Sequence, residues 1–332
     1  MYIQRIEKTA RLIGVKGSVA ARQEKFAKKL HADFSKMLED TFEKNGVVTR
    51  DDVEGFYNNA FPNLDIEINI NNRNSVSYNL SDKKTSIKGY SLDVDFGLKS
   101  FITKSDVDEI SYLEHENTHL ITAVVHPKYL ASHVKTYTEP KYDDASYFYK
   151  MNLYKREING LPECMINEFK ADKRARYSRV RGYVDGYLSN PIYTSEDKIF
   201  ILKNWRLRLL NEMNAYKVGK YSRVKYLCPV DELSKKIKNG EEVKENHEFD
   251  FLEKTMSYDS SQYATVDLKI KMLKTFVKRL QKEAYQETLD EFFFPQKLKM
   301  LEKMLVKEMA KAGHDIKRFS ADRLQKLPSY DL

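Results

Sequence analysis

The chain has 332 residues, with 57 Lys and Arg against 49 Asp and Glu, which gives a formal net charge of +8 at pH 7. Hydrophobic residues make up 41% and aromatic residues 12%, a composition that argues against a disordered chain. The two cysteines, Cys164 and Cys228, are too few for a disulfide framework or a four-thiolate metal site. No apolar run predicts a membrane span or a signal peptide, so we expect a soluble protein that is cytoplasmic or delivered without a classical signal.

The N-terminal half is predicted to form one helix followed by a small sheet. Apolar residues spaced three and four apart predict an amphipathic helix over residues 18–44. Apolar and polar residues then alternate over Leu64–Ile70, 76–80 and 92–98. This alternation predicts three half-buried strands of a mostly antiparallel sheet.

The pattern becomes helical again at residue 105. Ser105 is the predicted N-cap, with Asp108 in the capping-box position. The helix is expected to run to Val125, because His126 and Pro127 follow it.

Most of the remaining chain is also predicted to be helical. Helices are expected over residues 161–177, over residues 195–217 and beyond residue 267, with one break near Phe294 and Pro295. Residues 235–253 are charged and are expected to form a loop.

His115, Glu116 and His119 form an H-E-x-x-H pattern within the helix predicted from residue 105. Four residues advance an α-helix by about 400°, so the two imidazoles lie on one face, about 6 Å apart along the axis. Two nitrogens at that separation can bind one tetrahedral zinc ion. Glu116 projects beside the metal, where it can act as a general base on a zinc-activated water and pass the proton to a leaving amine.

This arrangement resembles the zincin metallopeptidases, in which a sheet packs beside the motif helix and its edge strand holds an extended substrate. The resemblance covers residues 64–220. It implies hydrolysis of peptide bonds in a protein or peptide substrate, with one zinc ion per chain on His115 and His119 and with Glu116 as the general base. It also implies that the strand at residues 90–98 is the substrate-binding edge.

The third zinc ligand would distinguish the zincin subfamilies. The metzincin pattern needs a glycine and a histidine where this chain has Thr122 and Val125, so that subfamily is rejected. His126 lies seven residues beyond His119, about 10 Å along a continued helix, which is too far to share a metal. We expect His126 to interact with the last carbonyls of the helix.

Glu168 is the preferred third ligand. It stands in the segment Asn-Glu-Phe-Lys-Ala-Asp, which resembles the E-x-x-A-D motif of gluzincins. That resemblance implies that Glu168 binds zinc and that Asp172, one turn later, braces a zinc-bound histidine. The segment around Glu168 matches more of a known zinc-binding motif than the segment around the alternative, Glu212. Its helix also follows the H-E-x-x-H helix sooner in the chain.

Glu212 is the alternative third ligand. It lies on the same helix stripe as Trp205, Leu209 and Tyr216, where an unpaired carboxylate would be costly. A metal ion would remove that cost, and so would an arginine such as Arg176 or Arg179. The choice between the two glutamates stays open at this level.

The sequence offers candidate residues for two further roles, stabilising an oxyanion and binding phosphates. Tyr216, His126 or a tyrosine of the Tyr-rich segment 137–154 could stabilise an oxyanion, and the sequence does not choose among them. Residues 170–181 include six Lys and Arg that could bind phosphates, but a solvated helix face is the preferred interpretation. Nucleic acid is therefore not an expected partner.

The expected fold class is α+β, mainly α, with a zincin-like domain and helical additions at both ends. The predicted domains are an N-terminal helical segment (1–60), the zincin-like metallopeptidase domain (61–232) and a C-terminal helical region (233–332). The helices of the last region are expected to be core or a surface for a protein partner. The alternative function is a basic structural or interaction protein, such as a virion or secretion-delivered component, with a vestigial or structural metal site.

Overall fold

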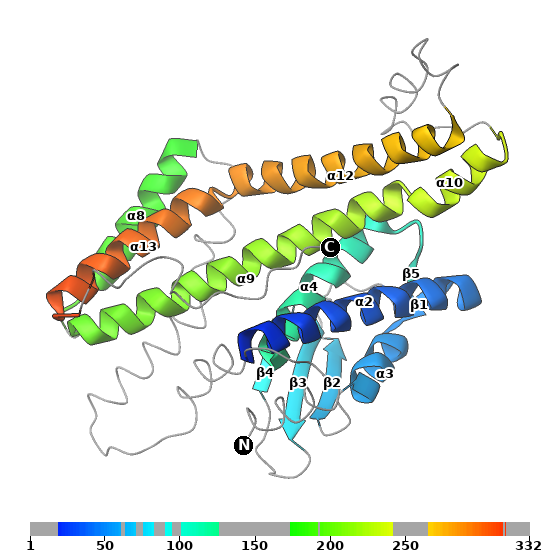
Figure 1. The fold of residues 1–332 in the computed structure, drawn as a ribbon. Coiled ribbons are helices and arrows are strands. Elements are labelled where there is room, and N and C mark those ends of the chain that lie inside the picture. Colours follow the sequence, from blue (N-terminus) through cyan, green and yellow to red (C-terminus); the bar gives the residue numbers. More distant parts are fainter. Residues whose placement is uncertain are drawn as a thin grey trace.

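The computed structural model describes residues 19–60, 64–70, 76–82, 90–94, 101–125, 173–191, 193–241, 265–314 and 316. Their elements in chain order are α2 (Val19–Asn45), β1 (Val47–Thr49), α3 (Arg50–Ala60), β2 (Leu64–Ile70), β3 (Val76–Asp82), β4 (Tyr90–Val94), β5 (Phe101–Thr103), α4 (Val107–Val125), α8 (Lys173–Leu188), α9 (Ser195–Leu227), α10 (Val230–Lys238), α12 (Val266–Glu291) and α13 (Phe294–Lys311). This part of the chain is mostly helical with small antiparallel sheets, as expected (Figure 1). None of its helices combines the length and apolar character that a membrane crossing requires.

The three strands predicted from alternating residues form one antiparallel sheet in the order β2-β3-β4. In its register, Ile68 stands opposite Tyr78, and Tyr78 stands opposite Leu92. The apolar positions that predicted the strands are thus matched across the sheet. The third strand begins at Tyr90 and is described to Val94, and residues 95–98 of the prediction lie outside the described residues.

A second, two-stranded sheet was not predicted. β1 pairs antiparallel with β5, and Val48 stands opposite Ile102, with both side chains buried. Each strand has only three residues. An alternating pattern cannot be recognised over so short a length.

The motif helix α4 begins at Val107, so its N-cap lies one residue later than predicted. The backbone N–H of Ile110 donates to the carbonyl of Asp106, which is therefore the first helical acceptor. The Asp106 carboxylate accepts hydrogen bonds from the Thr103 backbone N–H at 2.9 Å and from its hydroxyl at 2.7 Å. The prediction of Ser105 as the N-cap is thus wrong, because Asp106 occupies the cap position and its side chain fastens α4 to β5.

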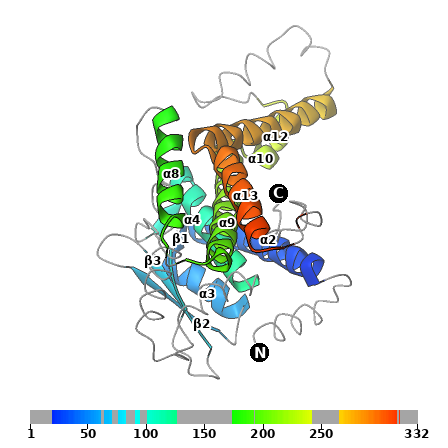
Figure 2. The same ribbon diagram turned by 90° about the vertical axis from the view of Figure 1, so that its left-hand side faces the viewer.

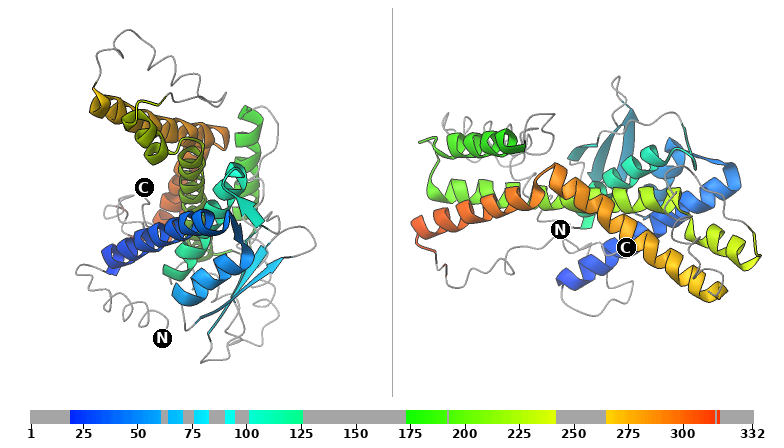
Figure 3. Two further views of the ribbon diagram at one scale, coloured as in Figure 1. Left: turned by 90° about the vertical axis from the view of Figure 1, so that its right-hand side faces the viewer. Right: turned by 90° about the horizontal axis from the view of Figure 1, so that it is seen from above.

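The long helix α9 is the central element of the described chain. Its N-terminus is the capping box of Thr194 and Asp197, in which each side chain accepts a hydrogen bond from the other residue's backbone N–H. In Figure 1, α12 and α13 lie above α9, and α4 lies below it. Figure 2 and Figure 3 show the same arrangement from the sides and from above.

Three hydrophobic clusters meet along α9. Trp205 is fully buried between α8 and α13, with Val184 and Leu301 in the same cluster. Near the other end of α9, Val224 packs with residues of α10 and α12. A third cluster joins Val218 of α9 to residues of α2 and α4. One helix therefore links the elements before and after it in the chain.

Among the described residues, the helical predictions for this half are confirmed, with corrections at the ends. Of the helix predicted over residues 161–177, residues 173–177 belong to α8, which ends at Leu188, and residues 161–172 lie outside the described residues. The helix predicted over residues 195–217 continues to Leu227, and the break near Phe294 separates α12 from α13. The loop predicted from residue 235 is wrong at its start, because α10 extends through Lys238. The first charged residues of the predicted loop are lysines in the last turn of α10, where positive charge is favourable.

Candidate metal centre

The candidate site lies between α4 and α9, which pack side by side in antiparallel orientation. Contacts that pair the two helices are Asp108 with Arg223 at 2.7 Å, Ser111 with Gly219 at 2.9 Å and His119 with Asn211 at 2.7 Å. Residue numbers rise along α4 as they fall along α9. This register brings the H-E-x-x-H turn of α4 opposite the middle of α9.

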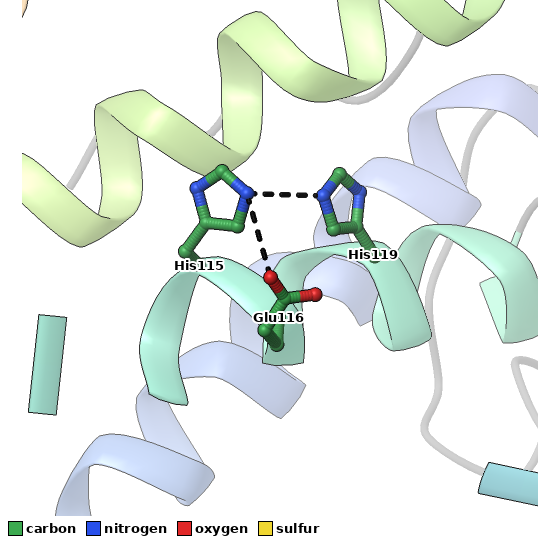
Figure 4. A group of neighbouring side chains, drawn as sticks. All are labelled: His115, Glu116 and His119. Atoms are coloured by element: carbon green, nitrogen blue, oxygen red, sulfur yellow. Dashed lines mark hydrogen bonds and ion pairs between the residues drawn. The ribbon is translucent and has the colours of Figure 1, made fainter. Parts of the chain in front are cut away.

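The histidines of the motif point toward one another, as predicted from their helical spacing (Figure 4). The Nε2 atoms of His115 and His119 are 3.2 Å apart, and a carboxylate oxygen of Glu116 lies 3.8 Å from His115 Nε2. One donor atom from each of the three residues falls within 4.8 Å of the others. All three side chains are mostly buried, with 12 to 13% of their surface exposed.

Glu212 of α9 reaches the same point from the facing helix. Its two carboxylate oxygens lie 3.6 Å from His115 Nε2 and 3.5 Å from His119 Nε2. The structure therefore brings the alternative third ligand to both histidines. Glu168 and Asp172 lie outside the described residues, and their roles stay predictions.

Electrostatics couple Glu212 to the histidines. Burial would lower the pKa of His119, but the Glu212 carboxylate outweighs it and raises the pKa to about 9. Burial would likewise raise the pKa of Glu212, but His119 and His115 hold it well below its usual range. Glu212 is thus a buried anion paired with a protonated His119, and a metal ion that binds here must displace that proton.

Asn211 contacts the far side of the His119 ring, with its side-chain nitrogen Nδ2 2.7 Å from Nδ1. A histidine that binds a metal through Nε2 has its proton on Nδ1 and needs an acceptor there. Turning the Asn211 amide by 180° exchanges its nitrogen and oxygen, and the oxygen then accepts that proton. No sequence pattern indicates a role for Asn211, although it directly precedes Glu212.

Tyr216, one turn after Glu212, packs against the H-E-x-x-H motif. Its ring lies edge-on to His115 at a centroid distance of 4.6 Å and stacks on Phe292 at 5.1 Å. Burial and the nearby Glu212 carboxylate raise the pKa of Tyr216. The hydroxyl therefore stays protonated and can donate a hydrogen bond. His126 and residues 137–154, the other predicted oxyanion partners, lie outside the described residues.

A buried polar network supports the opposite side of α4. The Ser35 hydroxyl of α2 donates to the Glu114 carboxylate at 2.6 Å, and His31 Nδ1 lies 3.7 Å from the same carboxylate. His31 and Glu114 expose only 1% and 2% of their side chains. Glu114 directly precedes His115, so α2 holds the motif helix at the point where the site begins.

Comparisons with protein-family models, with curated proteins and with solved structures give no match to this chain. The chemistry of the site is therefore inferred from its own atoms. These are two imidazole nitrogens, a carboxylate beside them on α4 and a second carboxylate from α9.

Proposed function

We propose that the protein is a zinc-dependent metallopeptidase of gluzincin type, with His115, His119 and Glu212 as zinc ligands and Glu116 as the general base. The spacing of the donor atoms supports this assignment. Ligand atoms about 2.1 Å from a tetrahedral zinc ion lie about 3.4 Å from one another. The two Nε2 atoms are 3.2 Å apart, and oxygens of Glu212 lie 3.5 and 3.6 Å from them.

The donor set also has the right chemistry for zinc. Imidazole nitrogens and one carboxylate are a common ligand set of catalytic zinc sites, which keep a position open for water or substrate. The neighbouring histidines keep Glu212 ionised, as a ligand must be, and zinc binding would release the proton of His119. Asn211 can fix the ring of His119. The small antiparallel sheet before the motif helix is consistent with a zincin-like domain.

When bound, zinc would supply a Lewis acid that polarises the peptide carbonyl and lowers the pKa of water to about 7. Glu116 performs the proton transfer. Its carboxylate lies beside the two imidazoles on α4, where it can accept a proton from the attacking water and give it to the leaving amine. Tyr216, whose ring packs edge-on against His115, is the residue that we assign to stabilise the developing oxyanion through its protonated hydroxyl.

The deciding experiment combines zinc content with peptide hydrolysis. We expect about one zinc ion per wild-type chain. Glu116→Gln should keep the zinc and lose hydrolysis of a peptide library by about hundredfold or more, because it removes only the base. The matched control is Glu287→Gln, the same change at an exposed position of α12. Two results would favour the alternative function, a structural or interaction protein. One is a wild-type protein that binds no zinc, and the other is a zinc-bound protein whose peptide hydrolysis does not depend on Glu116.

The same zinc measurement identifies the third ligand. His119→Ala and Glu212→Ala should lose zinc, because each removes a donor atom from the triad. Glu168→Ala should retain it. If Glu168→Ala loses zinc and Glu212→Ala retains it, the third ligand is Glu168, as the sequence favours.

A further inference from the structure

The helices α4 and α9 are in backbone contact at Gly219. A Cβ atom at this position would lie 2.8 Å from the backbone oxygen of Ser111 and 3.3 Å from Cβ of His115. The Ser111 hydroxyl also donates a hydrogen bond to the Gly219 carbonyl, at 2.9 Å. A carbon atom cannot approach a carbonyl oxygen to 2.8 Å without strain, so this spacing of the helices requires glycine.

Gly219 shares one face of α9 with the residues of the metal centre. Glu212 precedes it by seven residues, close to two helical turns, and Tyr216 lies between them. Across the interface, His115 follows Ser111 by four residues, about one turn. The contact at Gly219 and the contact at Glu212 therefore belong to the same stretch of helix packing.

We infer that Gly219 is a positioning residue of the metal centre: its missing side chain lets α9 approach α4 closely enough for Glu212 to reach both imidazoles. This inference rests on the proposed function, because it concerns the binding of zinc by Glu212. Gly219 itself contacts neither the metal nor a substrate. It acts through the distance between the two helices.

The expected displacement is large compared with the tolerance of a zinc site. With alanine at position 219, the 2.8 Å contact would have to widen to about 3.4 Å, the start of ordinary van der Waals contact. The atom in the way is a backbone oxygen, so no flexible side chain can move aside. Zinc–ligand distances hold to within about 0.2 Å, which is less than the required shift.

The test compares zinc affinity in Gly219→Ala, in the wild type and in a matched glycine variant. Gly182→Ala is the control, since a Cβ atom at that position of α8 has no heavy atom within 4 Å. Alanine favours a helix interior over glycine, so the control should keep the wild-type zinc affinity and melt no lower than the wild type. Gly219→Ala should melt lower and bind zinc about tenfold to hundredfold more weakly.

A second background separates positioning from general loss of structure. In Glu212→Gln, the carboxylate that Gly219 positions is already absent. Adding Gly219→Ala to that variant should then weaken the remaining zinc affinity by less than about threefold. An equal loss in both backgrounds would mean that Gly219 has a structural role only, and it would overturn the inference.

Ser111→Ala keeps the test decisive if Gly219→Ala does not fold. It removes the hydrogen bond at the same crossing without a clash, and we expect about fivefold weaker zinc binding. Unchanged zinc affinity in Ser111→Ala and in any folded Gly219→Ala overturns the inference while the proposed function stands. A wild-type protein that binds no zinc overturns both.

Discussion

Asn211 of α9 contacts the H-E-x-x-H motif of α4 directly, because its side chain lies 2.7 Å from His119 Nδ1. We expect Asn211→Ala to bind zinc about tenfold to hundredfold more weakly, since the ring of His119 loses the partner that orients it. Asn211→Asp is the matched variant. It offers an oxygen of similar size and should retain most of the affinity.

A competition titration with a chelator measures both variants. Wild-type affinity in Asn211→Ala would show that the contact with His119 does not orient the ring. Equal losses in the two variants would point to packing around this buried position instead, because only the aspartate preserves an acceptor.

At the level of elements, α2 makes polar contacts of two very different kinds. Glu114→Ala removes the buried acceptor of the Ser35 hydroxyl, and it should lower the free energy of unfolding by about 2–4 kcal/mol. Lys29→Ala removes an exposed ion pair with Asp33 on the same helix, and it should change that energy by less than about 0.5 kcal/mol. Urea unfolding measures the free energy of unfolding of both variants. Similar losses in the two variants would contradict the conclusion that the buried network of Ser35, His31 and Glu114 holds α2 against α4.

The elements that the sequence predicts well are those whose period repeats several times. The helix of residues 18–44 and the strands that became β2, β3 and β4 each show such a repeat. β1 and β5 were missed because each has three residues and is defined by its partner strand, which lies far away in the chain. The start of α4 was misplaced by one residue, since neighbouring Ser105 and Asp106 are both good capping residues.

The candidate site divides in the same way. His115, Glu116 and His119 could be predicted because helical geometry alone brings them together. Glu212 comes from a helix more than ninety residues away, so the sequence could offer it only beside Glu168, as a carboxylate on an apolar stripe. Gly219 and Asn211 have no local signal, because their importance depends on what the facing helix presents.

At the level of the whole molecule, α9 joins the three hydrophobic clusters and the candidate metal centre. We therefore expect a disturbance at one point of this helix to alter the packing at the others. Elements of the predicted N-terminal and C-terminal regions share these clusters, with α2 in one and α12 and α13 in the others. We expect the described elements to unfold together rather than in separate steps.

Trp205, the single tryptophan, provides a probe of that behaviour, because it is fully buried on α9, seven residues before Glu212. Zinc that binds the folded chain should stabilise it by about 2.7 kcal/mol at a free concentration of 100 times Kd. The unfolding midpoint seen by Trp205 emission should then rise with zinc in the wild type and stay fixed in His119→Ala. Because α9 spans the clusters, far-ultraviolet circular dichroism should give the same midpoint. Two separate transitions, with only one moved by zinc, would show that the metal centre and the cluster around Trp205 fold independently.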